Sequence, residues 1–218
     1  MRSRALLALA TTLVVGACSR PSPLLAPSPA GLDLPAPDSF VVRFATTKGN
    51  FDVMVHRDWA ARGADRVFWL ARNGYYDGAR FFRAVPNFVV QFGIAADPRV
   101  TAAIRTRRIA DDSVSRSNVR GTLSFAAAGP NSRTTQLFIN LRDNQRLDRL
   151  GFAVFGQVVA GMDVVDSLYT GYGEGAPRGK GPTQDRITGE GEPYLAREFP
   201  LLDQIRGVKV VRRYGGNR

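Results

Sequence analysis

Residues 81–93 read FFRAVPNFVVQFG, an apolar stretch interrupted by one arginine, a Pro-Asn pair and one glutamine. Its Phe and Val residues favour β-strands, and the Pro-Asn pair favours a turn. We therefore expect two short strands, near residues 80–84 and 88–92. Arg83 and Gln91 then lie among apolar side chains, which makes both of them candidates for a functional site.

Similar strand patterns flank this stretch on both sides. Residues 40–44 and 51–55 are expected to form a β-hairpin around the turn Lys48-Gly49-Asn50. Further strands are expected at residues 121–126, 136–141, 152–159 and 208–211. Many short strands with little helix indicate a mainly β domain, either a closed barrel or a sandwich.

Two amphipathic helices are expected beside the strands. The first follows Asp58, a predicted N-cap, and ends at Asn73-Gly74. The second covers residues 161–168. Residues 94–118 and 171–200 are longer than the connections such a domain needs, and long loops are often functional.

The first 17 residues are typical of a bacterial export signal, with two arginines followed by an apolar run too short to span a bilayer. Val15-Gly16-Ala17-Cys18 resembles the lipobox of bacterial lipoproteins, which implies cleavage before Cys18 and lipidation of that residue. Cys18 is the only cysteine of the chain. The alternative is an ordinary cleaved signal that contains a cysteine by chance.

Proline marks the segment between the signal and the domain. Six of the chain's 13 prolines lie between Pro21 and Pro37, so residues 18–38 are expected to be an extended polyproline II linker. The expected divisions of the chain are a signal at residues 1–17, this linker, a folded domain at residues 39–212 and a tail at residues 213–218.

Charge and composition exclude several classes of function. The formal net charge is +11, but nucleic acid is a poor candidate partner for an exported protein. One basic cluster consists of Arg105, Arg107 and Arg108. Because Asp111 and Asp112 follow it, we interpret this segment as a solvated loop. The chain has one histidine, so we expect no His-rich metal site. No GxSxG nucleophile motif is present.

The glycine-rich string GYGEGAPRGKG, residues 171–181, is not a phosphate-binding loop. A Walker motif ending at Gly179-Lys180 requires glycine where Glu174 stands, and Ser or Thr where Gly181 stands. We therefore expect neither a cofactor nor a metal.

Rotation about an X-Pro peptide bond is a reaction that needs none of these groups. Its barrier of roughly 18–20 kcal/mol comes from lost amide resonance. The twisted prolyl nitrogen regains its lone pair and becomes a hydrogen-bond acceptor, so a fixed arginine in an apolar groove stabilises mainly the transition state. Arg83 is suited to this role.

Three sequence blocks resemble the cyclophilin family. FFRAVPNFVVQFG is similar to the cyclophilin motif FHRxxPxFxxQGG, and GTLSFAAAGPNSRTTQLFIN (residues 121–140) and FAVFGQVVAGMDVVDSL (residues 152–168) follow in the order found in the family. The resemblance implies a closed, eight-stranded antiparallel β-barrel capped by two α-helices. It also implies peptidyl-prolyl cis-trans isomerase activity.

The resemblance also implies roles for individual residues. It matches Arg83 to the catalytic arginine and Gln91 to the glutamine that holds the substrate carbonyl. The residues it places along the substrate groove are Phe88, Val89, Ala126, Ala128, Gln136, Phe138, Leu147 and Phe152.

Several positions depart from the cyclophilin pattern. Phe82 replaces the usual histidine, and Phe92-Gly93-Ile94 replaces Gly-Gly-Asp, so we expect the end of this strand to pack differently. Asn87 stands where glycine is common, and asparagine tolerates the left-handed conformation. Arg146 replaces the tryptophan that helps eukaryotic members bind cyclosporin, which makes sensitivity to the drug doubtful.

The resulting hypothesis is an exported, monomeric isomerase that is attached to a membrane by its lipid anchor and binds no nucleic acid. Its partners are expected to be X-Pro segments of unfolded or folding envelope proteins. An alternative hypothesis from a different functional class is a catalytically weak chaperone or scaffold module that has the same fold and binds proline. A third, weaker hypothesis is an envelope lipoprotein whose barrel is only a spacer.

Overall fold

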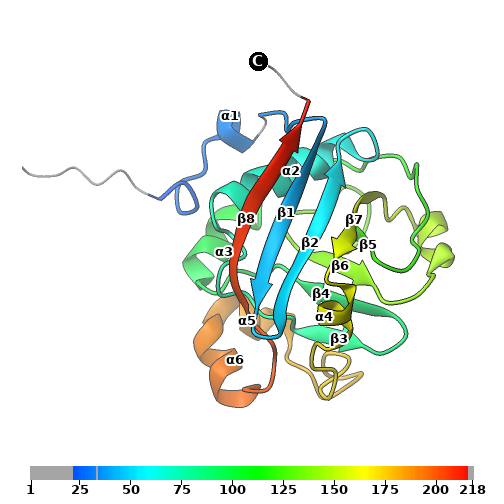
Figure 1. The fold of residues 1–218 in the computed structure, drawn as a ribbon. Coiled ribbons are helices and arrows are strands. Elements are labelled where there is room, and N and C mark those ends of the chain that lie inside the picture. Colours follow the sequence, from blue (N-terminus) through cyan, green and yellow to red (C-terminus); the bar gives the residue numbers. More distant parts are fainter. Residues whose placement is uncertain (1–21, 33, 216–218) are drawn as a thin grey trace, which may run out of the picture.

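The computed structural model describes residues 22–32 and 34–215. Within them, eight strands form one antiparallel sheet in the order β3-β4-β6-β5-β7-β2-β1-β8 (Figure 1). The strands are β1 (Ser39–Thr46), β2 (Gly49–His56), β3 (Arg83–Val85), β4 (Val89–Phe92), β5 (Thr122–Phe125), β6 (Leu137–Asn140), β7 (Val154–Ala160) and β8 (Ile205–Tyr214). Each predicted strand and the predicted hairpin are confirmed, with ends shifted by a few residues.

The predicted closure of the barrel is wrong. The sheet curls into an open half-barrel with β3 and β8 at its two edges. Within the described residues, an isolated bridge between Arg80 and Gln204 joins the segments that precede these two strands. A closed barrel requires its edge strands to pair along their length, and the three residues of β3 form too short an edge.

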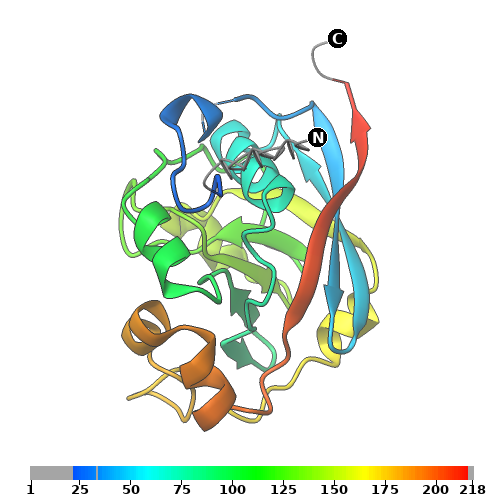
Figure 2. The same ribbon diagram turned by 90° about the vertical axis from the view of Figure 1, so that its left-hand side faces the viewer.

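The predicted count of two helices is also wrong. The described residues form α1 (Pro29–Leu32), α2 (Ala61–Arg72), α3 (Pro98–Ile104), α4 (Met162–Asp166), α5 (Gln184–Glu190), α6 (Glu192–Glu198) and the 3₁₀ helix η1 (Gln145–Leu150). Helices α2 and α4 correspond to the two predicted helices. Helices α3, α5 and α6 lie in the two segments that were expected to be long loops, and α5 and α6 lie at the end of the molecule opposite α1 and α2 (Figures 1 and 2).

The part of the predicted linker that the structure describes packs on the domain. Leu32 in α1 is buried, and Ala36 belongs to the main apolar core. The backbone N–H of Ala36 donates to Asp65 Oδ1 of α2 at 2.8 Å. The fold therefore begins before Ser39, because these apolar and backbone groups find partners on the helix.

The predicted signal peptide and Cys18 lie outside the described residues. No helix among the residues that the structure describes is long and apolar enough to cross a bilayer.

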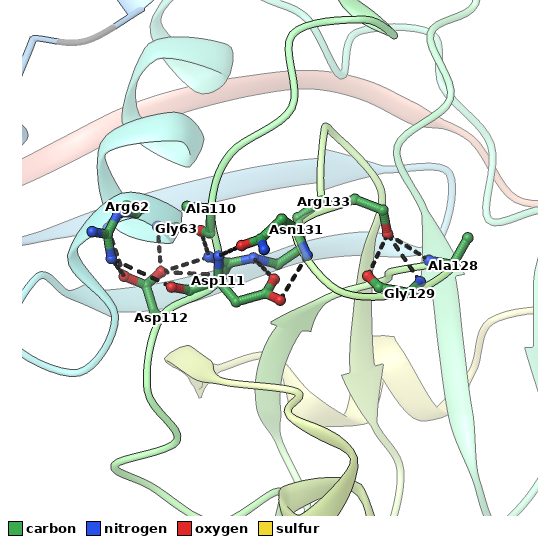
Figure 3. Close-up of polar contacts among 10 residues, drawn as sticks. Arg62, Gly63, Ala110, Asp111, Asp112, Ala128, Gly129, Asn131 and Arg133 are labelled. Atoms are coloured by element: carbon green, nitrogen blue, oxygen red, sulfur yellow. Dashed lines mark hydrogen bonds and ion pairs between the residues drawn. The ribbon is translucent and has the colours of Figure 1, made fainter.

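The expectation of a solvated loop at residues 105–112 is wrong for its acidic end. The arginines of this loop are exposed, but the Asp112 side chain is only 6% exposed. Its two carboxylate oxygens accept from the backbone N–H groups of Arg62 and Gly63 at 3.0 and 2.9 Å, and Arg133 pairs with it at 3.1 Å (Figure 3). Asp112 therefore satisfies free N–H groups at the start of α2, whereas the predicted cap Asp58 does not: the N-cap position is Ala60 and makes no side-chain cap hydrogen bond.

The departures from the cyclophilin pattern at Phe82 and Ile94 have a structural explanation. Both side chains are buried in a second apolar cluster, whose other members come from α5, α6 and the segment before β8: Ile187, Tyr194, Leu195 and Leu202. The apolar replacements thus form the surface on which α5 and α6 pack. Asn87 has φ 55°, which confirms the expected left-handed conformation.

Candidate active site

Three neighbouring strands bring the predicted functional residues into one row. Arg83 on β3 lies opposite Gln91 on β4, and Gln91 lies opposite Phe138 on β6. Paired residues on adjacent strands point to the same face of a sheet. The register therefore places a guanidinium, an amide and an aromatic ring side by side.

Alternate residues of the same strands point to the opposite face. Val90, Phe92 and Ile139 belong to the main core, whereas Val89 and Phe138 form a separate apolar cluster with Leu147 of η1. Phe88, Ala126 and Phe152 pack against this smaller cluster from their partly exposed positions. The rings of Phe138 and Phe152 meet edge to face at 5.5 Å.

These side chains line an open hollow of about 320 Å³. Of the predicted site residues, its walls include Arg83, Phe88, Val89, Gln91, Ala126, Phe138, Leu147 and Phe152. Ala128 and Gln136 line an adjoining hollow of about 210 Å³, which shares Gln91 and Ala126 with the first. The structure thus gathers every predicted groove residue into two connected hollows.

Arg83 lies at one wall of the larger hollow with its side chain 20% exposed. Its Nη1 donates to Gln91 Oε1 at 3.1 Å, and its Cζ lies 5.5 Å from the centroid of the Phe88 ring. Arg146 approaches the same ring at 4.9 Å. Phe88 therefore contacts two cations, and Arg83 combines a fixed amide partner with an aromatic neighbour.

A chain of amides leads away from Arg83. Gln91 Nε2 donates to Gln136 Oε1 at 2.8 Å, and Gln136 Nε2 donates to Gln184 Oε1 of α5 at 3.0 Å. Gln91 is nearly buried, with 7% of its surface exposed. Since its oxygen faces Arg83 and its nitrogen faces Gln136, its orientation is set from both sides.

Sequence reasoning missed four residues that also line the larger hollow: Ala127, Glu174, Arg178 and Gln184. Glu174 accepts from Arg83 Nε at 2.5 Å and from Arg83 Nη2 at 2.7 Å. The hydrogen bonds from Arg83 hold the pKa of the Glu174 carboxyl below its usual value of 4.5. The string GYGEGAPRGKG marks this segment in the sequence, but its glycine pattern raises only the question of phosphate binding and does not indicate a partner for Arg83.

A polar network behind η1 was also missed. Asn118 Oδ1 accepts from Ser124 and Asn140, and Asn118 Nδ2 donates to Asp148 Oδ1 at 2.8 Å. Asn144 Nδ2 in turn donates to the Phe88 carbonyl at 3.0 Å. This network joins β5, β6 and η1 and so fixes Leu147 and Phe88 at the hollow.

Asp148 stays ionised within this network. Burial alone would raise its pKa, but hydrogen bonds from Ser117 and from Asn118 outweigh that effect and leave the pKa below the usual 3.8. Among the described residues, no group of three or more His, Cys, Asp and Glu side chains is placed to hold a metal ion.

Comparisons with known proteins agree with this geometry. A family model described as cyclophilin type peptidyl-prolyl cis-trans isomerase/CLD matches residues 41–190. A peptidyl-prolyl cis-trans isomerase of Acinetobacter baylyi is 35% identical over 133 residues, which cover 59% of this chain and 71% of the relative. Peptidyl-prolyl cis-trans isomerase A of Dickeya dadantii is 35% identical over 133 residues, which cover 58% and 70%.

The fold is also found among solved structures. A crystal structure of a cyclophilin type peptidyl-prolyl cis-trans isomerase from Cryptosporidium parvum matches with a TM-score of 0.59 and 20% identity, covering 81% of this chain and 99% of that chain. The residues matched by the family model, 41–190, include β3, β4 and β6, the strands that carry the hollow. The chain therefore belongs to the cyclophilin-type peptidyl-prolyl cis-trans isomerase family.

Proposed function

We propose that this protein accelerates rotation about X-Pro bonds in its hollow, and that Arg83 donates a hydrogen bond to the prolyl nitrogen as the amide twists. The planar amide offers no acceptor at that nitrogen, so the contact strengthens on the way to the transition state. The observation that supports the proposal is the placement of Arg83 beside the apolar cluster of Val89, Phe138 and Leu147.

The apolar cluster is the proposed seat for the pyrrolidine ring. Phe138 and Leu147 are 5% and 6% exposed, and Phe88 and Phe152 extend the wall toward solvent. An apolar ring that fills this space excludes water from Arg83, and lower local polarity strengthens the hydrogen bond to the twisted amide. Gln91 and Gln136 are the proposed contacts for the substrate backbone.

A protease-coupled proline-peptide assay tests the proposal. The wild-type protein is expected to shorten the slow cis-to-trans phase in proportion to its concentration. Arg83→Ala is expected to lower the catalysed rate by roughly tens-fold to a thousandfold, in line with a loss of about 2–4 kcal/mol of transition-state stabilisation. A wild-type protein that leaves the slow phase unchanged would contradict isomerisation and favour a scaffold module that only grips proline.

The cellular setting is a separate proposal that rests on the sequence. A basic start, a short apolar run and Val15-Gly16-Ala17-Cys18 support export and lipidation at Cys18. The proposed substrates are then X-Pro segments of envelope proteins that are still folding. The substitution Cys18→Ser is expected to move the protein out of the membrane fraction, which cell fractionation measures. Retention of the variant in that fraction would contradict lipid anchoring at this residue.

A further inference from the structure

The glycine-rich loop at residues 171–181 brings a carboxylate into the hollow. Glu174 contacts Arg83 across 91 positions of sequence, and both residues line the same cavity. None of the cyclophilin motif residues identified in the sequence accounts for this carboxylate. Its position raises the question of whether it helps Arg83 or competes with substrate for it.

The hydrogen bonds of Arg83 decide between these roles. A guanidinium has five N–H groups. Glu174 accepts one from Nε and one from Nη2, and Gln91 accepts one from Nη1. One N–H on Nη1 and one on Nη2 are left beyond these bonds. The carboxylate thus binds the Nε edge of the group and leaves donors for a second acceptor.

The loop holds the carboxylate in place. The backbone N–H of Gly181 donates to the Glu174 carbonyl at 2.9 Å, and the N–H of Gly175 donates to Glu174 Oε1 at 3.2 Å. A Cβ at Gly179 would collide with the Glu174 carbonyl oxygen, so the backbone of the loop closes tightly over this residue. The glycines that would suit a phosphate site here serve to pack the loop around Glu174.

We propose that Glu174 is a positioning residue that clamps the guanidinium of Arg83 in the orientation needed to meet the twisted amide. The inference rests on the proposed role of Arg83. A long, flexible side chain is otherwise free to choose among rotamers, and a bidentate carboxylate selects one geometry. Because the clamp is already in place before substrate arrives, its removal should affect turnover more than peptide binding.

A second ion pair in the same region supplies a matched control. Arg80 Nη2 pairs with Glu192 at 2.5 Å, and the side chains of Arg80 and Glu192 are 12% and 27% exposed. The corresponding exposures for Arg83 and Glu174 are 20% and 29%. Glu192 is not among the residues that line the larger hollow. The two pairs therefore share chemistry, length and burial and differ in their relation to the site.

The experiment compares Glu174→Gln with Glu192→Gln in the full chain. We expect Glu174→Gln to lower the rate at saturating proline peptide by roughly 5- to 30-fold, with peptide Kd changed less than about twofold. Glu192→Gln is expected to keep wild-type kinetics within about twofold. Glu174→Asp, whose shorter carboxylate cannot reach both nitrogens in the same way, is expected to lose activity as well. Thermal unfolding confirms that each variant is folded.

A double-mutant cycle separates positioning from a general effect on the loop. In an Arg83→Ala background, Glu174→Gln is expected to have no further effect on the rate. The inference is overturned if Glu174→Gln matches Glu192→Gln, if it is faster than wild type, or if its effect persists without Arg83. If Arg83→Ala itself retains wild-type activity, the proposed mechanism fails along with the clamp, whereas loss in Arg83→Ala but not in Glu174→Gln refutes the clamp alone.

Discussion

The two faces of β3, β4 and β6 differ sharply in what they carry. The inner face holds Ala84, Val90, Phe92 and Ile139 in the main core, whereas the outer face holds the row that contains Arg83. These side chains alternate along the same short strands. Residues one position apart are therefore expected to control different properties, stability on the inner face and turnover on the outer face.

The largest effect is expected from Phe92→Ala, which tests the inner face. Phe92 is fully buried, and its ring meets those of Phe44, Tyr76 and Phe81 at 5.2–5.7 Å. Its truncation is expected to lower the free energy of unfolding by about 3–5 kcal/mol, measured by urea titration. Phe88→Ala, on the outer face, is the control and should lose less than about 1.5 kcal/mol while it lowers kcat/KM. Equal losses of stability would contradict the division between the faces.

The next effect concerns the network that supports the outer face. Asp148→Ala removes the acceptor of Ser117 Oγ and of two Asn118 donors. We expect the free energy of unfolding to fall by about 2–3 kcal/mol at pH 7, because these partly buried donors lose their partner. We also expect kcat/KM to fall, though by less than in Arg83→Ala. The reason is that Asp148 adjoins Leu147, which lines the hollow.

The pH dependence of this effect has a definite sign. The folded-state pKa of Asp148 is depressed, so its contribution is present above the ordinary value near 3.8 and is lost as pH falls through the folded pKa. The stability difference between wild type and Asp148→Ala should thus hold from pH 7 to about pH 5 and shrink in more acidic solution. A difference that grows as the solution is acidified would show that the carboxylate is not the stabilising form.

The smallest effect concerns the charged rim of the outer face. Arg142 and Arg146 line a hollow next to Phe88, and Arg178 lines the hollow that contains Arg83. Proline peptides with Glu beside the X-Pro pair are expected to show roughly two- to fivefold higher kcat/KM than matched Lys peptides at low salt, with the preference lost near 0.5 M salt. Arg142→Gln/Arg146→Gln is expected to reduce the preference. A salt-independent preference would point to shape and not to charge.

The alternating strands and most of the site were predictable from local sequence. Local alternation predicts the strands, and the resemblance to the cyclophilin motif names Arg83, Gln91 and Phe138, which the register places side by side. The closure of the sheet was not predictable, because alternation within a strand is the same in a closed barrel and in an open half-barrel. A closed barrel and an open half-barrel differ only in whether the two edge strands, β3 and β8, pair with each other. Alternation within a single strand does not report on that pairing.

Contacts between distant segments account for the other differences. Asp112 caps α2 although Asp58 stands at the expected position, and Ala36 packs on α2 although proline dominates its neighbourhood. Glu174 lies in a loop whose composition suggested only phosphate binding. In each case the partner lies tens of residues away, where neither periodicity nor spacing carries information.

The central claim is that Arg83 acts on the transition state. NMR exchange measurements on a proline peptide, with wild type and Arg83→Ala, report the catalysed rate at saturation and the peptide Kd together. The account predicts that the rate falls at least about tenfold while Kd changes less than about threefold. A fall in affinity that accounts for the whole loss of kcat/KM, with the saturated rate unchanged, would contradict it.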